Sequence, residues 1–187
     1  MIEMANFRYY TDGAATMIRK KGKYLREAGG WAFVLLIDGC EDSNCSGGCP
    51  LTTNNEMELY AIYASMKDFL LRCESGDVIE VCSDSSYCID IFTKWVRNWQ
   101  KRGWRKSDGK PIKNQKLVKT IWKLMADIDD NGCTLRFLKV KGHSYDKMNN
   151  KADELAVEAK MYAFKSGKTT YFDKNDGLLG GKSKFAN

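Results

Sequence analysis

Residues 52–70 read TTNNEMELYAIYASMKDFL, and this stretch decides how the chain can fold. Asn54 or Asn55 can cap a helix, because short amide side chains accept hydrogen bonds from the first free backbone N–H groups. Apolar residues then recur every three or four positions, which predicts a long helix with one face packed inward. A Gly-Asp pair ends this pattern, and the mostly apolar residues 78–83 predict a strand. A strand after a long helix indicates a crossover connection and parallel pairing.

Three strands are predicted ahead of that helix. Residues 7–11 are rich in aromatics, residues 31–37 form an apolar run, and an Asp-Gly turn signal follows each of them. Residues 40–53 are rich in Cys, Ser and Gly and predict a loop followed by a returning strand. The three strands would form an antiparallel meander.

The second half of the chain alternates helical and strand patterns. Helices are predicted over residues 85–105, 114–129 and 149–164, with a strand over 134–140. The order of the elements therefore predicts an α/β fold in which helices cover a mixed sheet.

Composition restricts the class of protein. The 187 residues are 43% hydrophobic and 29% charged, which suits one domain with a substantial core. No apolar run approaches the ~20 residues that a membrane span needs, and the N-terminus lacks a secretory pattern. We therefore expect a cytoplasmic protein without a membrane partner. The net charge of +6 favours polyanionic partners, and seven scattered cysteines indicate free thiols in a reducing compartment.

Four carboxylates lie near the ends of predicted elements. Asp12 follows the first strand, Glu58 lies early in the first helix, Asp84 follows the fourth strand and Asp153 opens the last helix. If the first and fourth strands are neighbours, Asp12 and Asp84 meet at one sheet edge, where carboxylates repel one another unless cations neutralise them. Oxygen ligands select hard ions, and two such ions can promote phosphodiester cleavage. Taken singly, each residue can also be a turn, a cap or a partner of a helix dipole.

Seven motifs in one consistent order make the sequence similar to the bacterial-type ribonuclease H family. The resemblance implies a ribonuclease H-like α/β fold, with helices on both faces of a five-stranded mixed sheet. The domain would span residues 1–164, and a Gly/Lys-rich tail over 165–187 is expected to be mobile. The motifs are YTDG at 10–13, TTNNEMEL at 52–59, SDSSY at 83–87, WVRNWQKRGW at 95–104, KPIKN at 110–114, VKGH at 140–143 and KADELA at 151–156.

The resemblance implies that Asp12, Glu58, Asp84 and Asp153 are catalytic carboxylates. They would bind two Mg²⁺ ions, for which Mn²⁺ can substitute. His143, the only histidine of the chain, aligns with the family's mobile catalytic histidine. A lone histidine is more often a surface residue, but the preceding Val-Lys-Gly favours a role in shuttling protons or releasing product.

Several polar residues match substrate contacts of the family. Asn54 and Asn55 align with asparagines that contact the backbone of the family's substrate, an RNA–DNA hybrid. An amide can both donate to and accept from an RNA 2′-hydroxyl. Thr53 and Asn114 align with residues that line a pocket for a DNA phosphate, and Ser85 can add a polar contact.

Residues 94–106 combine tryptophans with cations and resemble the family's basic protrusion, which holds the DNA strand. Cations bind phosphates without reading sequence, and tryptophan can pack on a deoxyribose or a base. The alternative is a set of core tryptophans beside a solvated charged face. The contacts expected here are Trp95, Trp99, Lys101, Arg102 and Trp104.

Three segments depart from the family pattern, and the third is the tail from Lys165 onward. Residues 17–24 replace a Gly/Pro-rich loop and bring four cations. Cys40, Cys45 and Cys49 fall within ten residues, but their spacing is not that of a common zinc motif. An ordinary surface hairpin tip is expected there, and a metal or disulfide role is the alternative.

The predicted function is hydrolysis of the RNA strand of RNA–DNA hybrids without sequence specificity, leaving 5′-phosphate and 3′-hydroxyl ends. We expect a monomer with no obligate protein partner. One alternative is another enzyme on a related fold, such as an integrase or a junction-cutting nuclease; the protrusion and the TTNN motif argue against it. The other is a hybrid-binding module without catalysis, against which the complete carboxylate set argues.

Overall fold

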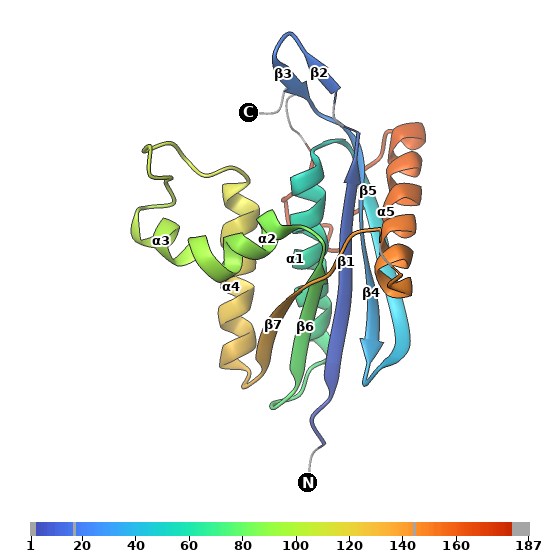
Figure 1. Ribbon diagram of the computed structural model, residues 1–187, viewed down its shortest axis with the longest axis vertical. Helices are drawn as coiled ribbons and strands as arrows, with labels where there is room; N and C mark the ends of the chain where they lie inside the picture. Colours follow the sequence, from blue (N-terminus) through green and yellow to red (C-terminus); the bar gives the residue numbers. More distant parts are fainter. Residues whose placement is uncertain (1–2, 17, 144, 181–187) are drawn as a thin grey trace.

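A five-stranded mixed sheet forms the centre of the molecule (Figure 1), with the strand order β5-β4-β1-β6-β7. The computed structural model describes residues 3–16, 18–143 and 145–180. β1, β4 and β5 form the expected antiparallel meander, and β6 and β7 add parallel pairings. The strands are β1 (Asn6–Ala15), β4 (Glu27–Ile37), β5 (Cys40–Thr52), β6 (Val78–Ser83) and β7 (Thr134–Lys139).

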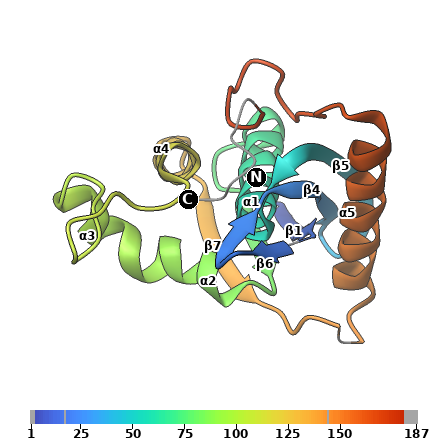
Figure 2. The same cartoon turned by 90° about the horizontal axis from the view of Figure 1, so that it is seen from above.

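Helices cover both faces of the sheet, as expected. α1 packs on one face with α4 beside it, and α5 packs on the opposite face against β1, β4 and β5 (Figures 1 and 2). Among the described residues, no helix is long and apolar enough to cross a membrane. The helices are α1 (Asn54–Arg72), α4 (Gln115–Asp130) and α5 (Lys147–Ser166).

The alternation of side chains along β1 explains the two layers. Phe7 and Tyr9 point into the main core, where the Phe7 ring meets Phe69 of α1 edge-on at 5.1 Å between centroids. Tyr10 belongs to a smaller apolar cluster on the other face, together with Ala152 of α5. Successive strand residues face opposite sides of a sheet, so one aromatic-rich strand supports both cores.

The segment predicted as one helix over residues 85–105 is divided into three parts. α2 (Ser86–Asp90) is followed by the π-helical turn η1 (Ile91–Trp95) and then by α3 (Val96–Lys101). π-turns inside helices are rare and are frequent at functional sites. Figure 2 shows that these elements project sideways from the sheet, and we call them the protrusion.

The Cys-rich segment is strand rather than loop, which corrects the prediction of a surface hairpin tip. Cys45 pairs with Phe33 and Cys49 with Gly29 along β5, so the cysteines are spread over an extended chain. Nine residues of strand separate Cys40 from Cys49 by roughly 30 Å, too far for one zinc ion. All three are free thiols.

A second difference is a short hairpin, β2 (Ile18–Lys20) with β3 (Lys23–Leu25), which occupies most of the basic segment over residues 17–24. Its turn residues Lys21 and Gly22 both have positive φ, as a tight two-residue hairpin turn requires. Met17 lies outside the described residues.

The C-terminal segment differs from the mobile tail that was expected. α5 continues to Ser166, and residues 167–180 then cross the outer side of α1 (Figure 2). Leu178 and Leu179 are buried against the main core, and the Tyr60 hydroxyl donates to the Asp176 carboxylate. Buried leucines and a hydrogen-bonded carboxylate hold this segment in place. Residues 181–187 lie outside the described part of the chain.

Candidate active site

The pairing of β1 with β6 places two of the predicted carboxylates side by side. The parallel register ends at the pair Thr11 and Ser83, so Asp12 and Asp84 are the next residues of their strands. Asp12 does not end β1, as the sequence suggested, because β1 continues to Ala15 in its pairing with β4. From Asp12 onward, β1 is paired with β4 but no longer with β6, which leaves space beside Asp12 on the β6 side.

Gly13 allows the third carboxylate to reach this edge. A Cβ atom on Gly13 would lie 2.3 Å from the backbone nitrogen of Glu58, closer than real contacts permit. The first turns of α1 therefore press directly on β1, and Glu58 points to Asp12. Sequence reasoning treated Gly13 only as part of a turn, although its lack of a side chain sets the spacing of the site.

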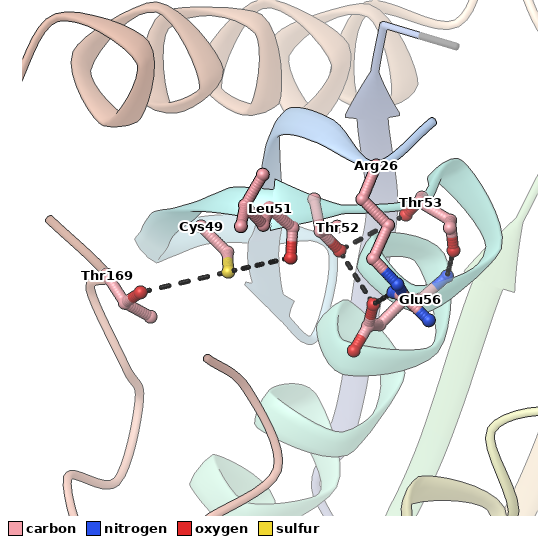
Figure 3. Close-up of polar contacts among 7 residues, drawn as sticks. All are labelled: Arg26, Cys49, Leu51, Thr52, Thr53, Glu56 and Thr169. Carbon is pink, nitrogen blue, oxygen red and sulfur yellow. Dashed lines mark hydrogen bonds and ion pairs between the residues drawn. The ribbon is translucent and has the colours of Figure 1, made fainter. Parts of the chain in front are cut away.

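Hydrogen bonds around Thr53 fix the start of α1 (Figure 3). The Thr53 hydroxyl caps the helix by accepting from the Glu56 backbone N–H at 3.2 Å. The Glu56 carboxylate is buried and pairs with Arg26 at 2.7 Å, so it is neutralised away from the other carboxylates. Asn54, predicted as a possible cap, instead accepts a hydrogen bond from the Ala15 backbone N–H and ties α1 to β1.

The carboxylates converge in one polar cavity. One oxygen each of Asp12, Glu58 and Asp84 lies within 4.8 Å of the others. Asp153 and His143 line the same cavity. Asp153 lies in the second turn of α5 rather than at its start, because the helix begins at Lys147 under an Asp146 cap. His143 is exposed and has a left-handed backbone, with φ of 52°.

Burial and mutual repulsion raise the proton affinity of the cluster. Asp12 and Glu58 are each only 4% exposed. Burial, together with the neighbouring Asp153 and Asp84, raises the pKa of Asp12 to about 8. Burial and the charges of Asp12 and Asp84 likewise raise the pKa of Glu58. A site that holds several negative charges so close together has a strong affinity for protons or cations.

The donor set fits a hard divalent cation. All the converging ligands are carboxylate oxygens, which Mg²⁺ and Mn²⁺ prefer. The Glu58 Oε2 atom is buried and has no hydrogen-bond partner within the described residues. The ion pairs found in that part of the chain leave the four carboxylates out.

A second groove lies on the protrusion and brings several predicted substrate contacts together. The Trp95 and Trp99 rings lie 5.7 Å apart. They line the groove with Asn55 and Arg102, and we call it the tryptophan groove. The sequence did not single out further lining residues as substrate contacts, although most of them lie within the matched motifs: Tyr87, Asn98, Lys106, Ser107, Ile112 and Lys113.

The remaining predicted contacts lie at other places. Ser85 lines the carboxylate cavity and caps α2 by accepting from the Cys88 backbone N–H. Lys101 ends α3, and its side chain is exposed. Trp95, Trp99 and Trp104 are all partly buried and pack against the main core, in agreement with the alternative of core tryptophans. Asn114 precedes α4 with φ of 53°.

Buried carboxylates at a sheet edge, next to a groove of tryptophans and cations, define a class of metal-dependent enzymes that act on phosphodiesters. The RNase H family model matches residues 4–161. The chain is 40% identical to the ribonuclease H of Thermoanaerobacter sp. (strain X514) over 150 residues, which are 80% of this chain and 86% of that protein. It is 39% identical to the ribonuclease H of Rhizobium johnstonii over 144 residues, 77% and 88% of the two chains.

A solved structure agrees on the fold. The crystal structure of LC9-RNase H1 matches with a TM-score of 0.68 at 22% identity, covering 100% of this chain and 90% of that chain. The chain belongs to the RNase H family.

Proposed function

We propose that this protein is a ribonuclease H, an endonuclease that hydrolyses the RNA strand of an RNA–DNA hybrid. The observation that carries the proposal is the convergence of the Asp12, Glu58 and Asp84 oxygens within 4.8 Å. The tryptophan groove beside them supports a nucleic-acid substrate. A protein of the same fold, LC11-RNase H1, has been crystallised with an RNA/DNA hybrid, at a TM-score of 0.56.

The four carboxylates would hold two Mg²⁺ ions, which Mn²⁺ can replace. When bound, such ions activate water for attack on phosphorus and stabilise the leaving oxygen. Asp12 and Glu58 supply buried, water-excluded ligand atoms whose charge a divalent ion neutralises. Because the same burial raises the pKa of Asp12 to about 8, protons compete with the metal below that pH.

His143 would move protons at the rim of the cavity. Its exposed side chain and left-handed backbone place it on a turn rather than within a helix or strand. An imidazole on such a turn can move toward the leaving group to transfer a proton and can move away when the product is released. The ends produced would be a 5′-phosphate and a 3′-hydroxyl.

The protein would distinguish a hybrid from other duplexes by contacting its RNA strand at one site and its DNA strand at another. Asn54 lines the carboxylate cavity and can read an RNA 2′-hydroxyl there. Asn55, Trp95, Trp99 and Arg102 line the tryptophan groove, which would accept the deoxyribose strand and its phosphates. Contacts of this kind read sugar and backbone, so cleavage would not depend on sequence. The monomeric state and the cytoplasmic location stay predictions.

End-labelled substrates test this function directly. RNA–DNA hybrid, duplex DNA and duplex RNA of one sequence are incubated with and without Mg²⁺. We expect cleavage of the hybrid alone, in its RNA strand and only with metal. Cleavage of duplex DNA would indicate a different nuclease on this fold, and binding without cleavage in either Mg²⁺ or Mn²⁺ would refute the proposed catalysis.

A further inference from the structure

α4 carries a row of lysines on its exposed side. Lys116, Lys119 and Lys123 follow a spacing of three and four residues, so they lie on one face of the helix over roughly 10 Å of its length. All three side chains are exposed. They line a groove of their own together with Gln115 and Thr120. We call these lysines the α4 lysine row.

The groove of the α4 lysine row follows the tryptophan groove along the chain. Lys113 lines the tryptophan groove, and Gln115 and Lys116 line the groove on α4. The Lys119 ammonium lies 5.4 Å from the centroid of the Trp104 ring, and Trp104 follows the last residue of α3 by three positions. The two views of the molecule place α4 between α3 and α1 (Figures 1 and 2). A strand leaving the tryptophan groove can therefore continue along α4.

The hydrogen bonds and ion pairs of the row leave its charge directed to solvent. Lys116 donates to the Gly177 carbonyl, a neutral acceptor. The neighbouring Asp176 carboxylate accepts from Tyr60 and from the Leu178 backbone instead. Lys123 pairs with Asp127 one turn further on, yet its side chain stays 75% exposed. Exposed ion pairs of this kind exchange readily for phosphate.

The charge order along α4 opposes the helix dipole. Cations are favourable near the C-terminus of a helix and anions near the N-terminus. Here Lys116 and Lys119 lie in the N-terminal half and Lys123 lies just past the middle, whereas the last turn is acidic, with Asp127, Asp129 and Asp130. Helix stability does not explain this order. Binding of an anion does explain this order, because the lysines and the free backbone N–H groups at the start of α4 would attract the same negatively charged ligand.

We propose that the α4 lysine row binds phosphates of the strand that leaves the tryptophan groove, and so lengthens the interface with the hybrid. This inference rests on the proposed function. Its three cations, spread over roughly 10 Å, suit about three successive phosphates of a strand. Phosphate binding of this kind adds affinity and salt dependence without reading bases.

The test compares Lys116→Gln/Lys119→Gln/Lys123→Gln with the wild-type chain. Binding is measured in chelator, so that no cleavage occurs, on a series of hybrids lengthened by one base pair at a time. The matched control, which removes the same charge from exposed lysines elsewhere, is Lys165→Gln/Lys168→Gln/Lys174→Gln.

On long hybrids, raising salt from about 50 to about 200 mM should weaken the row variant about 20- to 40-fold less than the wild type, as expected when about three phosphates are no longer neutralised. On the shortest hybrids, which fill only the tryptophan groove, the variant and the wild type should bind alike. In Mg²⁺, the variant should raise KM on long hybrids and leave kcat unchanged.

Equal salt dependence of the row variant and the wild type would overturn the inference, as would an equal effect in the control. Binding of a polyglutamate peptide by the wild type but not by the row variant, together with unchanged hybrid binding, would assign the row to an acidic protein and also overturn it. Failure of the wild-type protein to cleave even short hybrids would instead refute the nuclease proposal. The salt dependence of binding still tests the α4 lysine row in that case, because it is measured in chelator without cleavage.

Discussion

Removal of one charge from the carboxylate cluster should stabilise the metal-free protein while it destroys activity. Asp12→Asn keeps the size of the side chain and an oxygen for the Gly13 N–H, which donates to Asp12 at 2.9 Å. It removes one of three negative charges whose oxygens lie within 4.8 Å of one another. Without metal, burial first and repulsion by Asp153 and Asp84 second make the ionised Asp12 carboxylate unfavourable, so removal of its charge favours the folded state.

The magnitude follows from the pKa of Asp12, which rises from 3.8 to about 8 in the folded protein. A raised carboxyl pKa means that the folded state binds the proton more tightly. Its stabilising contribution is complete below about pH 4 and is lost as the pH rises towards 8. Between the unfolded pKa and pH 7 the loss amounts to at most about 4 kcal/mol, at 1.36 kcal/mol for each pH unit.

Thermal unfolding in chelator is the assay. One kcal/mol moves the Tm of a chain of this size by roughly 2–4 °C, so we expect Asp12→Asn to raise Tm by about 5–10 °C at pH 7 and by much less at pH 4. The exposed Asp129→Asn is the control and should change stability by no more than about 0.5 kcal/mol. A lower Tm for Asp12→Asn at pH 7, or the same gain at both pH values, would refute the electrostatic reasoning.

Four further changes test other parts of the structure. His143→Ala should lower kcat less than Asp12→Asn does, and inactivity as complete as that of Asp12→Asn would give the histidine a larger role. Lys101→Ala/Arg102→Ala should flatten the salt dependence of hybrid binding by about 0.7–0.9 in slope for each phosphate no longer neutralised, and an unchanged slope would remove both from the interface. Gly13→Ala should abolish cleavage and reduce unfolding stability, because its Cβ would lie 2.3 Å from backbone; normal activity would contradict this packing. Leu178→Ala should lower stability in urea by about 2–4 kcal/mol, whereas unchanged stability would show that the C-terminal segment is not packed.

The sequence predicted the features that depend on local pattern and chain order. The strand after the long helix implied a parallel pairing, and the register of β1 with β6 confirms it and identifies β1 as the partner that the sequence had left conditional. The adjacency of Asp12 and Asp84 followed from that pairing alone. The positions of Glu58 and Asp153 depend on how α1 and α5 pack, which periodicity indicates only coarsely.

The errors have a common physical cause. Glycine and serine in β5 suggested a loop, yet Gly48 pairs with Gly30 within the sheet. A Cβ on Gly48 would lie 2.6 Å from the Ala159 carbonyl oxygen of α5. Close approach of a helix requires the small residue. Leu178 and Leu179 follow Tyr171 and Phe172 in a segment that is otherwise mostly polar, so no local pattern shows that all four pack against the main core. Packing between distant segments decided both cases.

The raised pKa values could not be predicted from the sequence at all. Desolvation is the largest cause for both Asp12 and Glu58, and it depends on how completely the surrounding elements exclude water. The same burial makes a divalent cation the natural partner of the cluster.

Calorimetric titration with Mg²⁺ at a pH near 8 tests the central claim most directly. If the gathered carboxylates form a cation site, the wild-type protein binds Mg²⁺, and Glu58→Gln, which leaves the cavity its shape but removes a buried charge, binds it far more weakly. Equal Mg²⁺ affinity in the two proteins would contradict the account.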